Sequence, residues 1–434
     1  GLGDVYKRQT YNGSAQSPSW SNYNSSQLTI GGTSSATNAG SYSATFTPTS
    51  NYKWSDGTTT AKSASWTIGK ATGSITLSAS SLSLTYPKTS GTITVTRPGS
   101  GTVTASSGST NIATVSVSGT TITVTAKATG SATITVNVGA DTNYTAPSSK
   151  TFTVAVTLVS KTLSSNSWAV IKAVSDAGQG ANYWSVGATK SVTINGKVGA
   201  TTISSLKVDA FIIGFNHNSG KEGSNRIHFL LGKISGKFVG LVDSSYGSTT
   251  STSGAFTMNT SNTNSGGWGS SQMRSKVLGS ANSPTSPTAN TLMAALPSDL
   301  RAVMKSCTKY TDNNGGGNTA SNVSSTTDYL FLLSEYEVFA THQYCNDAEP
   351  NYQAQYDYFK AGNSKVANKH SATGTAAVWW LRSPNYNNIN NNNYFCAVSS
   401  SGSLDYNNAN NAYGVVPGFC NAWSHGVAIG ERRP

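Results

Sequence analysis

The sequence predicts a multidomain protein in which two all-β sandwiches precede a larger α+β domain. Three observations lead to this prediction. The chain has 434 residues, which is more than one hydrophobic core usually supports. β-branched residues alternate with polar ones in its first part, and helical spacing of apolar residues appears only after Leu158. We expect domains at residues 10–71, 72–156 and 157–434.

The first nine residues, GLGDVYKRQ, resemble the translated end of a sequencing adapter more than the start of a protein. The chain also lacks an initiating Met. We therefore leave residues 1–9 out of the fold prediction and expect the natural chain to extend further upstream. An export signal, or an attachment to a membrane or virion, would belong to that missing part.

Residues 10–71 alternate short runs such as Ser43–Phe46 with turn clusters of Asn, Gly and Ser. This pattern is typical of short antiparallel strands, so we expect a β-sandwich. The stretch GSYSATFTPTSNYKWSDGTTTAKSASWTIGKA, from Gly40 to Ala71, resembles the MBG-type bacterial Ig-like repeats of surface proteins. The resemblance implies an Ig-like domain.

Residues 72–156 place β-branched side chains at every second position, as in Thr92–Thr96 and Thr121–Thr125. This period buries one face of each strand and predicts a second sandwich of about seven strands. The stretch NIATVSVSGTTITVTAKATGSATITV, from Asn111 to Val136, resembles bacterial Ig-like domains of group 2. Neither sandwich contains a cluster of ionisable residues, so we expect both to be spacers.

Helical spacing begins at Trp168, Ile171 and Val174, and either Asn166 or Ser167 could cap that helix. The mixture of helical and strand patterns after this point predicts the α+β class. We expect further helices near 270–278, 290–306 and 334–341, and strands at 189–195, 208–215, 226–234 and 237–243.

Charged residues make up only 11% of the chain, and solubility must depend on neutral polar side chains. This composition is typical of exported stalks and adhesins. The net charge of +12 is diffuse, because no run of Lys or Arg exceeds two residues. We therefore expect no nucleic-acid partner, although diffuse positive charge favours anionic cell surfaces.

The C-terminal region contains six motifs that we consider as a set: GGWGSSQMR, LPSDLRAVMK, YLFLLSEYEVF, VWWLRSP, YFCAV and YGVVPGFC. This set resembles an uncharacterised domain family of gut-bacterial and phage surface proteins. The resemblance covers most of residues 160–420 and implies a C-type-lectin-like fold for residues 157–434.

Some members of that family resemble the variable proteins of diversity-generating retroelements, in which mutagenic reverse transcription replaces template adenines. An AAC codon for Asn then becomes another codon that ends in C, and such codons never encode Lys, Glu, Gln, Met or Trp. None of these five residues occurs from Ser383 to Ala422, although composition alone predicts about four. The segment holds twelve Asn instead. The resemblance implies a hypervariable region at about 383–422.

Tyr offers rigid contact area, and Asn and Ser offer adaptable hydrogen bonds, so this mixture is typical of binding surfaces. Fixed residues between the variable ones would form the frame: Trp379, Trp380, Leu381, Phe395, Val398, Gly402, Val415, Val416 and Phe419. The predicted ligand-binding positions are Asn385, Tyr386, Asn387, Asn388, Ile389, Asn390, Asn391, Asn392, Asn393, Tyr394, Ser399, Ser401, Ser403, Asp405, Tyr406, Asn407, Asn408, Asn410, Asn411 and Tyr413.

Two other functions stay open. Asn-rich runs are often disordered linkers, in which case the protein would be a structural stalk or tail protein. The lectin-like fold also includes formylglycine-generating, sulfatase-modifying enzymes, and Cys345 follows His342 at a spacing that would share one helix face. A lone H-x-x-C is more often structural, so we expect no enzyme and no catalytic residue.

The spacing of potential metal ligands predicts neither a metal site nor a cofactor. The four cysteines, Cys307, Cys345, Cys396 and Cys420, form no C-x-x-C pair, and the five histidines show no metal-binding spacing. Asp405 is the only carboxylate between residues 385 and 423, which argues against calcium-dependent sugar binding. Either a disulfide between Cys396 and Cys420 or free buried thiols would fit the sequence.

Taken together, these patterns predict an extracellular binding or adhesion protein on a bacterial cell surface or a phage virion. Its partner would be a protein or glycan on a cell surface.

Overall fold

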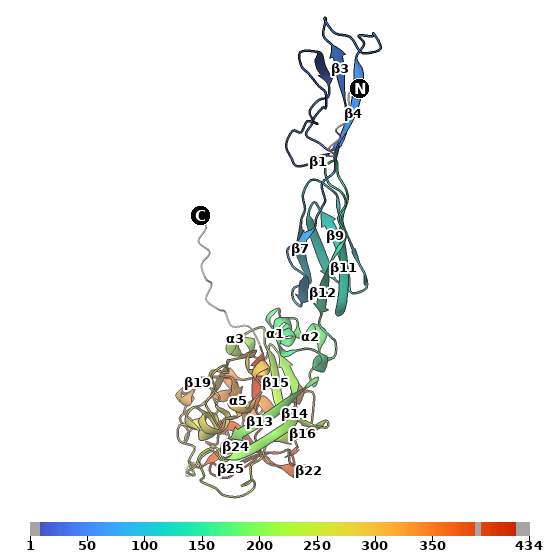
Figure 1. Ribbon diagram of the computed structural model, residues 1–434. Helices are drawn as coiled ribbons and strands as arrows, with labels where there is room; N and C mark the ends of the chain where they lie inside the picture. The colour runs from blue at the N-terminus through green and yellow to red at the C-terminus, as the bar shows by residue number, and fades with distance from the viewer. Residues whose placement is uncertain (1–8, 387–391, 422–434) are drawn as a thin grey trace. The chain divides into compact units, whose positions relative to one another are not determined.

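The computed structural model describes residues 9–386 and 392–421 and is mostly β, with 40% of residues in strands and 13% in helices (Figure 1). The chain divides into two compact units, Gly1–Leu158 and Val159–Pro434. None of the described helices has the length and apolar character that crossing a membrane requires.

The first unit begins with one four-stranded sheet in the order β1-β4-β3-β2. Strand β1 runs parallel to β4, and the other neighbours are antiparallel. Phe46 and Trp66 are buried on one face, and the ring of Trp20 packs edge-on against Phe46 at 5.0 Å. The strands are β1 (Gln9–Thr10), β2 (Leu28–Gly32), β3 (Gly40–Pro48) and β4 (Lys62–Gly69).

The rest of the first unit is a sandwich of two four-stranded sheets, β5-β7-β10-β9 and β6-β12-β11-β8. The alternation of β-branched residues buries pairs such as Ile122 with Val124 and Ile134 with Val136 in one core. No polar or charged side chain is buried in residues 9–158. The strands are β5 (Thr76–Leu77), β6 (Ser81–Thr85), β7 (Ser90–Thr96), β8 (Val103–Ser107), β9 (Ala113–Ser118), β10 (Thr121–Ala126), β11 (Gly130–Val138) and β12 (Lys150–Thr157).

The second unit is built around a nine-stranded sheet whose main path is β13-β14-β15-β16-β21-β22. Strand β26 joins this sheet beside β15 and also pairs with β17 and β20. The end of the described chain therefore lies among strands from much earlier in the sequence. The strands are β13 (Thr189–Val198), β14 (Thr201–Phe215), β15 (Ile227–Ile234), β16 (Lys237–Gly240), β17 (Met304–Lys305), β20 (Leu330–Phe331), β21 (Ala367–Lys369), β22 (Ala372–Ala377) and β26 (Gly418–Asn421).

Two smaller sheets complete the second unit. One is the hairpin of β18 (Cys307–Asp312) and β19 (Val323–Asp328). The other has the order β23-β24-β25 and consists of Trp379–Pro384, Tyr394–Val398 and Leu404–Asn408. This last sheet carries most of the predicted binding positions.

The helices of the second unit are short, and the predicted α+β, C-type-lectin-like class is wrong because the protein is mostly β. Pro297 divides the expected helix at 290–306 into two single turns, since its ring cannot continue a helix. The longest helix is α1 (Trp168–Asp176), which Ser167 caps by accepting a hydrogen bond from the amide of Val170. The remaining helices are η1 (Leu163–Ser165), α2 (Gly180–Tyr183), α3 (Ser219–Glu222), α4 (Gly267–Ser270), η2 (Met273–Leu278), α5 (Leu292–Ala295), α6 (Ser298–Arg301), η3 (Ala320–Asn322), α7 (Glu335–Phe339), η4 (Glu349–Tyr352) and α8 (Asp357–Lys360).

Candidate ligand-binding surface

The sheet β23-β24-β25 changes from fully buried to half-exposed across its three strands. Every residue of β23 is buried, whereas every residue of β25 is half-buried. The register places Tyr394 opposite Asn408 and Cys396 opposite Tyr406. The described part of the Asn-rich segment is therefore folded into paired strands, so the alternative of a disordered linker is wrong for residues 392–421.

The predicted frame residues lie where the sequence pattern places them. Trp379, Trp380, Phe395 and Val398 are all 0% exposed. The indole of Trp380 donates a hydrogen bond to the carbonyl of Phe256 at 3.0 Å, which fixes the ring inside the unit. Also buried are Leu381, Val415, Val416 and Phe419, and Gly402 has a positive φ in the turn between β24 and β25.

Most of the described binding positions reach the solvent. Asn392, Ser401 and Ser403 are exposed. Five predicted positions, Asn387, Asn388, Ile389, Asn390 and Asn391, lie outside the described residues. Half-buried are Tyr386, Asn393, Tyr394, Ser399, Asp405, Tyr406, Asn407, Asn408, Asn410, Asn411 and Tyr413. We refer to these half-buried residues and the three exposed ones as the Asn/Tyr surface.

Asn385 does not belong to this surface, and its predicted exposure is wrong. Only 2% of the residue is exposed. Its amide donates to the carbonyl of Tyr394, and its carbonyl accepts from the side chain of Asn264 at 3.1 Å. Asn385 directly follows β23, and these bonds make it part of the frame.

One end of the Asn/Tyr surface is a cluster of tyrosines. The ring of Tyr406 packs against Tyr344 at 4.9 Å and against Tyr394 at 5.0 Å. The hydroxyl of Tyr386 donates to Asp347 Oδ1 at 2.6 Å. Burial raises the pKa of the Tyr344 hydroxyl, and the neighbouring Tyr406 and Asp405 raise it further. The Tyr344 hydroxyl is therefore neutral and can both donate and accept hydrogen bonds.

Tyr344 and Asp347 also belong to this tyrosine cluster, although the sequence did not predict them. They lie between α7 and η4, far from the Asn-rich segment in sequence. The amide of Tyr386 donates to the carbonyl of Tyr344 at 2.9 Å, and this bond joins the two segments. No periodicity or motif in the sequence indicates this contact, since it depends on the packing of two loops.

The other end of the surface is organised around Tyr413. Its ring packs edge-on against Trp380 at 5.2 Å, and its hydroxyl donates to Asn407 Oδ1 at 3.2 Å. Asn408 accepts a hydrogen bond from the side-chain amide of Asn262 at 3.0 Å. These contacts hold the amides in place before any ligand binds, which lowers the entropic cost of recognition.

The proposed Cys-His arrangement of the enzyme alternative is absent. Helix α7 ends at Phe339, so His342 and Cys345 do not share a helix face. His342 is exposed, and its Nε2 lies 3.6 Å from Oδ1 of Asp347, whereas Cys345 is fully buried. Burial, reinforced by Glu349 and Glu335, raises the pKa of the Cys345 thiol far above its usual range, which makes it a poor nucleophile.

All four cysteines are free and buried, so the structure shows the free thiols and not the disulfide between Cys396 and Cys420, which the sequence had left open as alternatives. The thiol of Cys396 donates to Glu335 Oε2 at 3.5 Å. Cys420 lies on β26 beside His228 instead. The two cysteines therefore belong to different environments.

A second candidate site lies in the interior of the same unit, where charged side chains pair with one another. The ammonium of Lys309 donates to Glu222 at 2.7 Å, Glu337 at 3.0 Å and Tyr356 at 2.8 Å. Burial alone would lower the pKa of Lys309, but the two carboxylates outweigh it and raise that pKa above its usual value. The guanidinium of Arg382 pairs with the same Glu337.

Glu337 also completes a capping box at the start of α7. Its carboxylate accepts from the amide of Ser334 at 2.9 Å, and the Ser334 hydroxyl accepts from the amide of Glu337 at 3.1 Å. The ion pairs with Lys309 and Arg382 were not apparent from sequence spacing.

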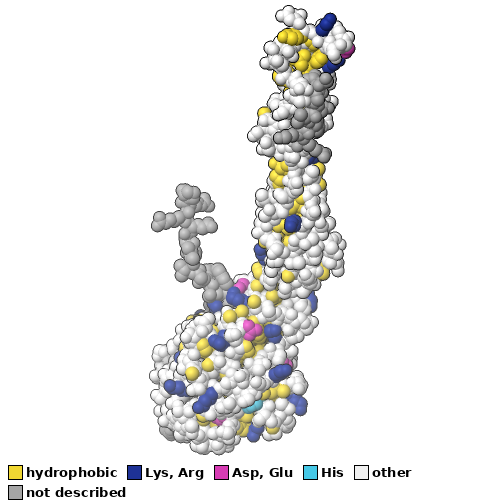
Figure 2. All heavy atoms as spheres, in the orientation of Figure 1, with side chains coloured by type: hydrophobic (Ala, Val, Ile, Leu, Met, Phe, Trp, Pro, Cys, Tyr) yellow, Lys and Arg dark blue, Asp and Glu magenta, His cyan; other side chains and the backbone are white. Residues whose placement is uncertain are grey.

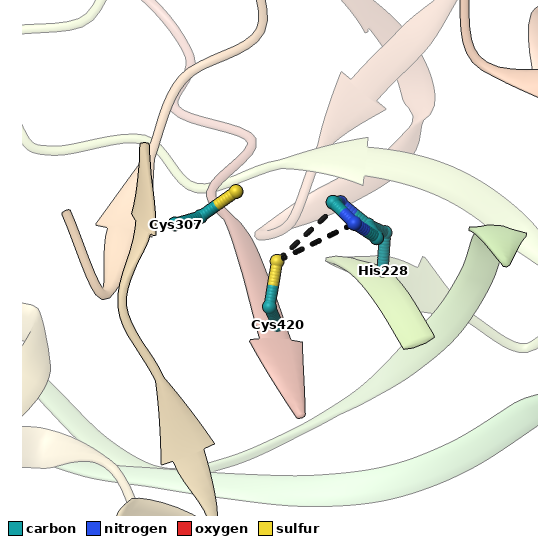
Figure 3. Close-up of side chains that lie close together, drawn as sticks. All are labelled: His228, Cys307 and Cys420. Atoms are coloured by element: carbon teal, nitrogen blue, oxygen red, sulfur yellow. Dashed lines mark hydrogen bonds between the residues drawn. The ribbon is translucent and has the colours of Figure 1, made fainter. Parts of the chain in front are cut away.

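Three side chains beside this cluster could hold a metal ion. Figure 3 shows that His228, Cys307 and Cys420 converge from separate strands, with the two sulfur atoms directed toward the imidazole. Cys420 Sγ lies 3.4 Å from His228 Nδ1. One ligand atom from each residue lies within 4.8 Å of the other two. The prediction of no metal site rested on sequence spacing, and the spacing carried no sign of this arrangement.

Lys and Arg side chains are scattered over the face drawn in Figure 2, and the described residues there form no continuous basic patch. This distribution agrees with the diffuse charge of the sequence.

Comparison with solved structures finds partial likeness to surface-layer and fibronectin-like domains. The S-layer protein SbsC domains 4 and 5 are 21% identical over 30% of this chain and 71% of that one, with a TM-score of 0.19. SbsC domains 4–9 are 16% identical over 46% of this chain and 25% of that one, with a TM-score of 0.18. The Clostridium thermocellum CbhA fibronectin(III)-like modules are 14% identical over 35% of this chain and 90% of that one, with a TM-score of 0.16. These TM-scores are too low to indicate a shared overall fold.

No curated protein matches the chain. One family model matches about two fifths of the chain. Residues 251–422, which include the Asn/Tyr surface, are similar to the family described as "Domain of unknown function (DUF6273)".

Proposed function

We propose that this chain is a surface-displayed binding protein whose Asn/Tyr surface recognises a protein or a glycan. The observation that carries the proposal is the contrast within one small sheet. Frame residues such as Trp380 and Phe395 are 0% exposed, and the edge strand beside them presents half-exposed Tyr, Asn and Asp side chains. A rigid base under adaptable polar groups is the arrangement of a binding surface.

The composition of the segment supports a repertoire of such surfaces. Side chains on an edge strand can change while the main-chain ladder to β24 persists, so substitutions there cost little stability. The absence of Lys, Glu, Gln, Met and Trp from 383–422 is the pattern that replacement of adenines in AAC codons would leave. Diversification by mutagenic reverse transcription is therefore part of the proposal.

The low charge content and the spacer-like sandwich support display outside the cell, on a bacterial surface or a phage virion. The core of residues 75–156 contains apolar side chains alone, and the charged fraction of the whole chain is 11%. A domain whose core is wholly apolar suits the role of a spacer.

Deep sequencing of the gene in a natural population tests diversification. Substitutions should concentrate at adenines in codons of the Asn/Tyr surface, and a near-copy of codons 383–422 should lie beside a reverse transcriptase gene. The codons for residues 72–156 in the same reads provide the control. Equal substitution rates at Trp379 and Asn407, or the absence of a template copy, would contradict this part of the proposal.

Display of randomised variants tests binding directly. A library of the full chain varied at Tyr406, Asn407, Asn408 and Tyr413 should yield binders to a chosen test protein or glycan after selection. The matched control is a library varied at Ser90, Thr92, Thr94 and Thr96, which are exposed on β7 of the sandwich. If the two libraries yield binders equally often, the Asn/Tyr surface has no special role in recognition.

A further inference from the structure

We propose that His228, Cys307 and Cys420 form a site for one zinc ion in the interior of the C-terminal unit (Figure 3). This site is independent of the Asn/Tyr surface. It brings together residues that no sequence motif connects, and it would tie the last described strand to the earlier strands of the sheet.

Hydrogen-bonded strands hold the three ligands in place. In the pairing of β15 with β26, His228 lies directly opposite Cys420. Cys420 also lies opposite Lys305 of β17, and Cys307 begins the next strand, β18. The hydroxyl of Tyr356 lies 3.0 Å from Nδ1 of His228 and orients the ring, so that Nε2 is the nitrogen left to bind the metal. A partner on the imidazole is the usual support of a metal-binding histidine.

The donor atoms select the class of metal. Two thiolates and an imidazole suit zinc and other thiophilic ions, whereas magnesium and calcium require oxygen ligands. Zinc lies about 2.3 Å from sulfur and about 2.0 Å from nitrogen, so its ligands are separated by roughly 3.5–4 Å. Cys420 Sγ already lies 3.4 Å and 3.8 Å from the two ring nitrogens of His228. The three donor atoms lie within 4.8 Å of one another, so they would have to draw together by about 1 Å to reach these separations.

Charge balance favours zinc over a monovalent ion. All three ligands are 0% exposed, and an uncompensated charge in such an interior is costly. The neighbouring charges Lys309, Arg382, Glu222 and Glu337 already balance as two cations and two anions. A divalent ion with two thiolates adds no net charge, whereas copper(I) with two thiolates would add a negative one.

Glu222 is the nearest further oxygen donor and the candidate fourth ligand. Its Oε2 lies 3.2 Å from Cys307 Sγ and 4.0 Å from His228 Nδ1. The same oxygen accepts a hydrogen bond from Lys309 at 2.7 Å, which fixes the carboxylate beside the site. Four donors would satisfy the tetrahedral preference of zinc.

Cobalt(II) provides a spectroscopic substitute for zinc. Because the site is buried, the full-length chain is refolded from denaturant under reducing, anaerobic conditions with either ion, and metal content is measured after removal of the excess. We expect about one metal ion per chain, an intense thiolate-to-cobalt charge-transfer band, and loss of that band when zinc replaces cobalt during refolding.

The chain offers matched cysteine controls. Cys307→Ser and Cys420→Ser should each reduce bound metal to below roughly one tenth of an ion per chain. Cys345→Ser and Cys396→Ser remove buried thiols elsewhere and should leave the stoichiometry near that of the wild type. Circular dichroism establishes that each variant folds. If a Ser variant does not fold, the corresponding Ala variant and His228→Gln replace it.

Three results would overturn the zinc site. The first is wild-type protein that folds but binds less than about one tenth of a metal ion per chain. The second is an equal loss of metal in the control variants. The third is a disulfide between Cys307 and Cys420, found by mass spectrometry in protein isolated without reductant, which would make the pair a structural crosslink.

Discussion

The sandwich of residues 75–156 and the interior of the C-terminal unit are stabilised in different ways. The sandwich core consists of side chains such as Ile122, Val124 and Ile134, and no polar side chain is buried there. The C-terminal interior buries Lys309 and Arg382 together with carboxylates, histidines and cysteines. Both regions are rich in strands, so the difference does not follow from the type of secondary structure.

The two cores therefore differ in the conditions on which their stability depends. Apolar burial stabilises in proportion to area and changes little with pH. A buried charge stabilises only while its partner is present and in the matching protonation state. We therefore expect the C-terminal unit to respond strongly to single substitutions and to pH, and the sandwich to respond mainly to loss of volume.

The largest expected effect follows from breaking a buried ion pair. Arg382→Leu leaves the carboxylate of Glu337 without its guanidinium and should destabilise the C-terminal unit by about 3–5 kcal/mol. Hydrogen exchange measured by mass spectrometry reports the two regions separately, and the sandwich peptides should not change. Arg301→Leu, at a partly exposed position, is the control. A loss of less than about 1 kcal/mol would mean that the pair contributes little.

A substitution that removes side-chain volume from the sandwich core should destabilise the sandwich and leave the C-terminal unit unchanged. Ile134→Ala opens a cavity between the two sheets of the sandwich and should destabilise it by about 2–5 kcal/mol. The effect should be the same at pH 5 and pH 7.5, because no ionisable group is buried in that core. The same hydrogen-exchange measurement applies, with the C-terminal peptides as the internal reference. A pH-dependent loss would contradict the contrast.

The third effect depends on pH. Burial raises the pKa of Glu349 to about 7, although hydrogen bonds from Asp312 and Ser383 oppose the shift. A raised carboxyl pKa means that the folded state holds a proton that the unfolded state has lost, so stability falls as pH rises from about 4.5 to about 7. Glu349→Gln should therefore gain up to roughly 3 kcal/mol relative to wild type across that window.

The measurement is the difference in unfolding free energy between the variant and the wild type at each pH. Taking the difference cancels the contribution of the buried His217 and His228, whose lowered pKa values make stability rise with pH. The difference should become constant above the raised pKa of Glu349. A difference that does not vary with pH would show that Glu349 titrates normally.

The smallest effect is expected on the Asn/Tyr surface. Ser401→Tyr, at an exposed turn position, should change stability by less than about 0.5 kcal/mol. Asn385→Tyr forces a larger side chain into the frame and should cost about 1–3 kcal/mol. Thermal denaturation of both variants distinguishes the surface from the frame. Similar losses at the two positions would place Ser401 in the frame as well.

Features that depend on neighbouring residues were predictable from the sequence. The alternation of β-branched residues predicts the strands of the sandwich, and the polar residue before Trp168 predicts the cap that Ser167 provides. The buried Trp379 and Trp380 and the turn at Gly402 also follow from local pattern. The helix expected at 290–306 was wrong, because Pro297 interrupts the helical spacing of the Leu residues.

Tertiary structure alone decided the sites. The sequence determined periodicity, caps and the composition of a candidate surface, since these depend on backbone geometry over a few residues. It could not determine that Asn385 would be buried and bonded to Asn264, or that Tyr344 would contact the surface. Nor could it bring Cys420 to His228, which is 192 residues away. Such contacts depend on which strands pair in the sheet, and side-chain alternation is the same whichever neighbour a strand acquires.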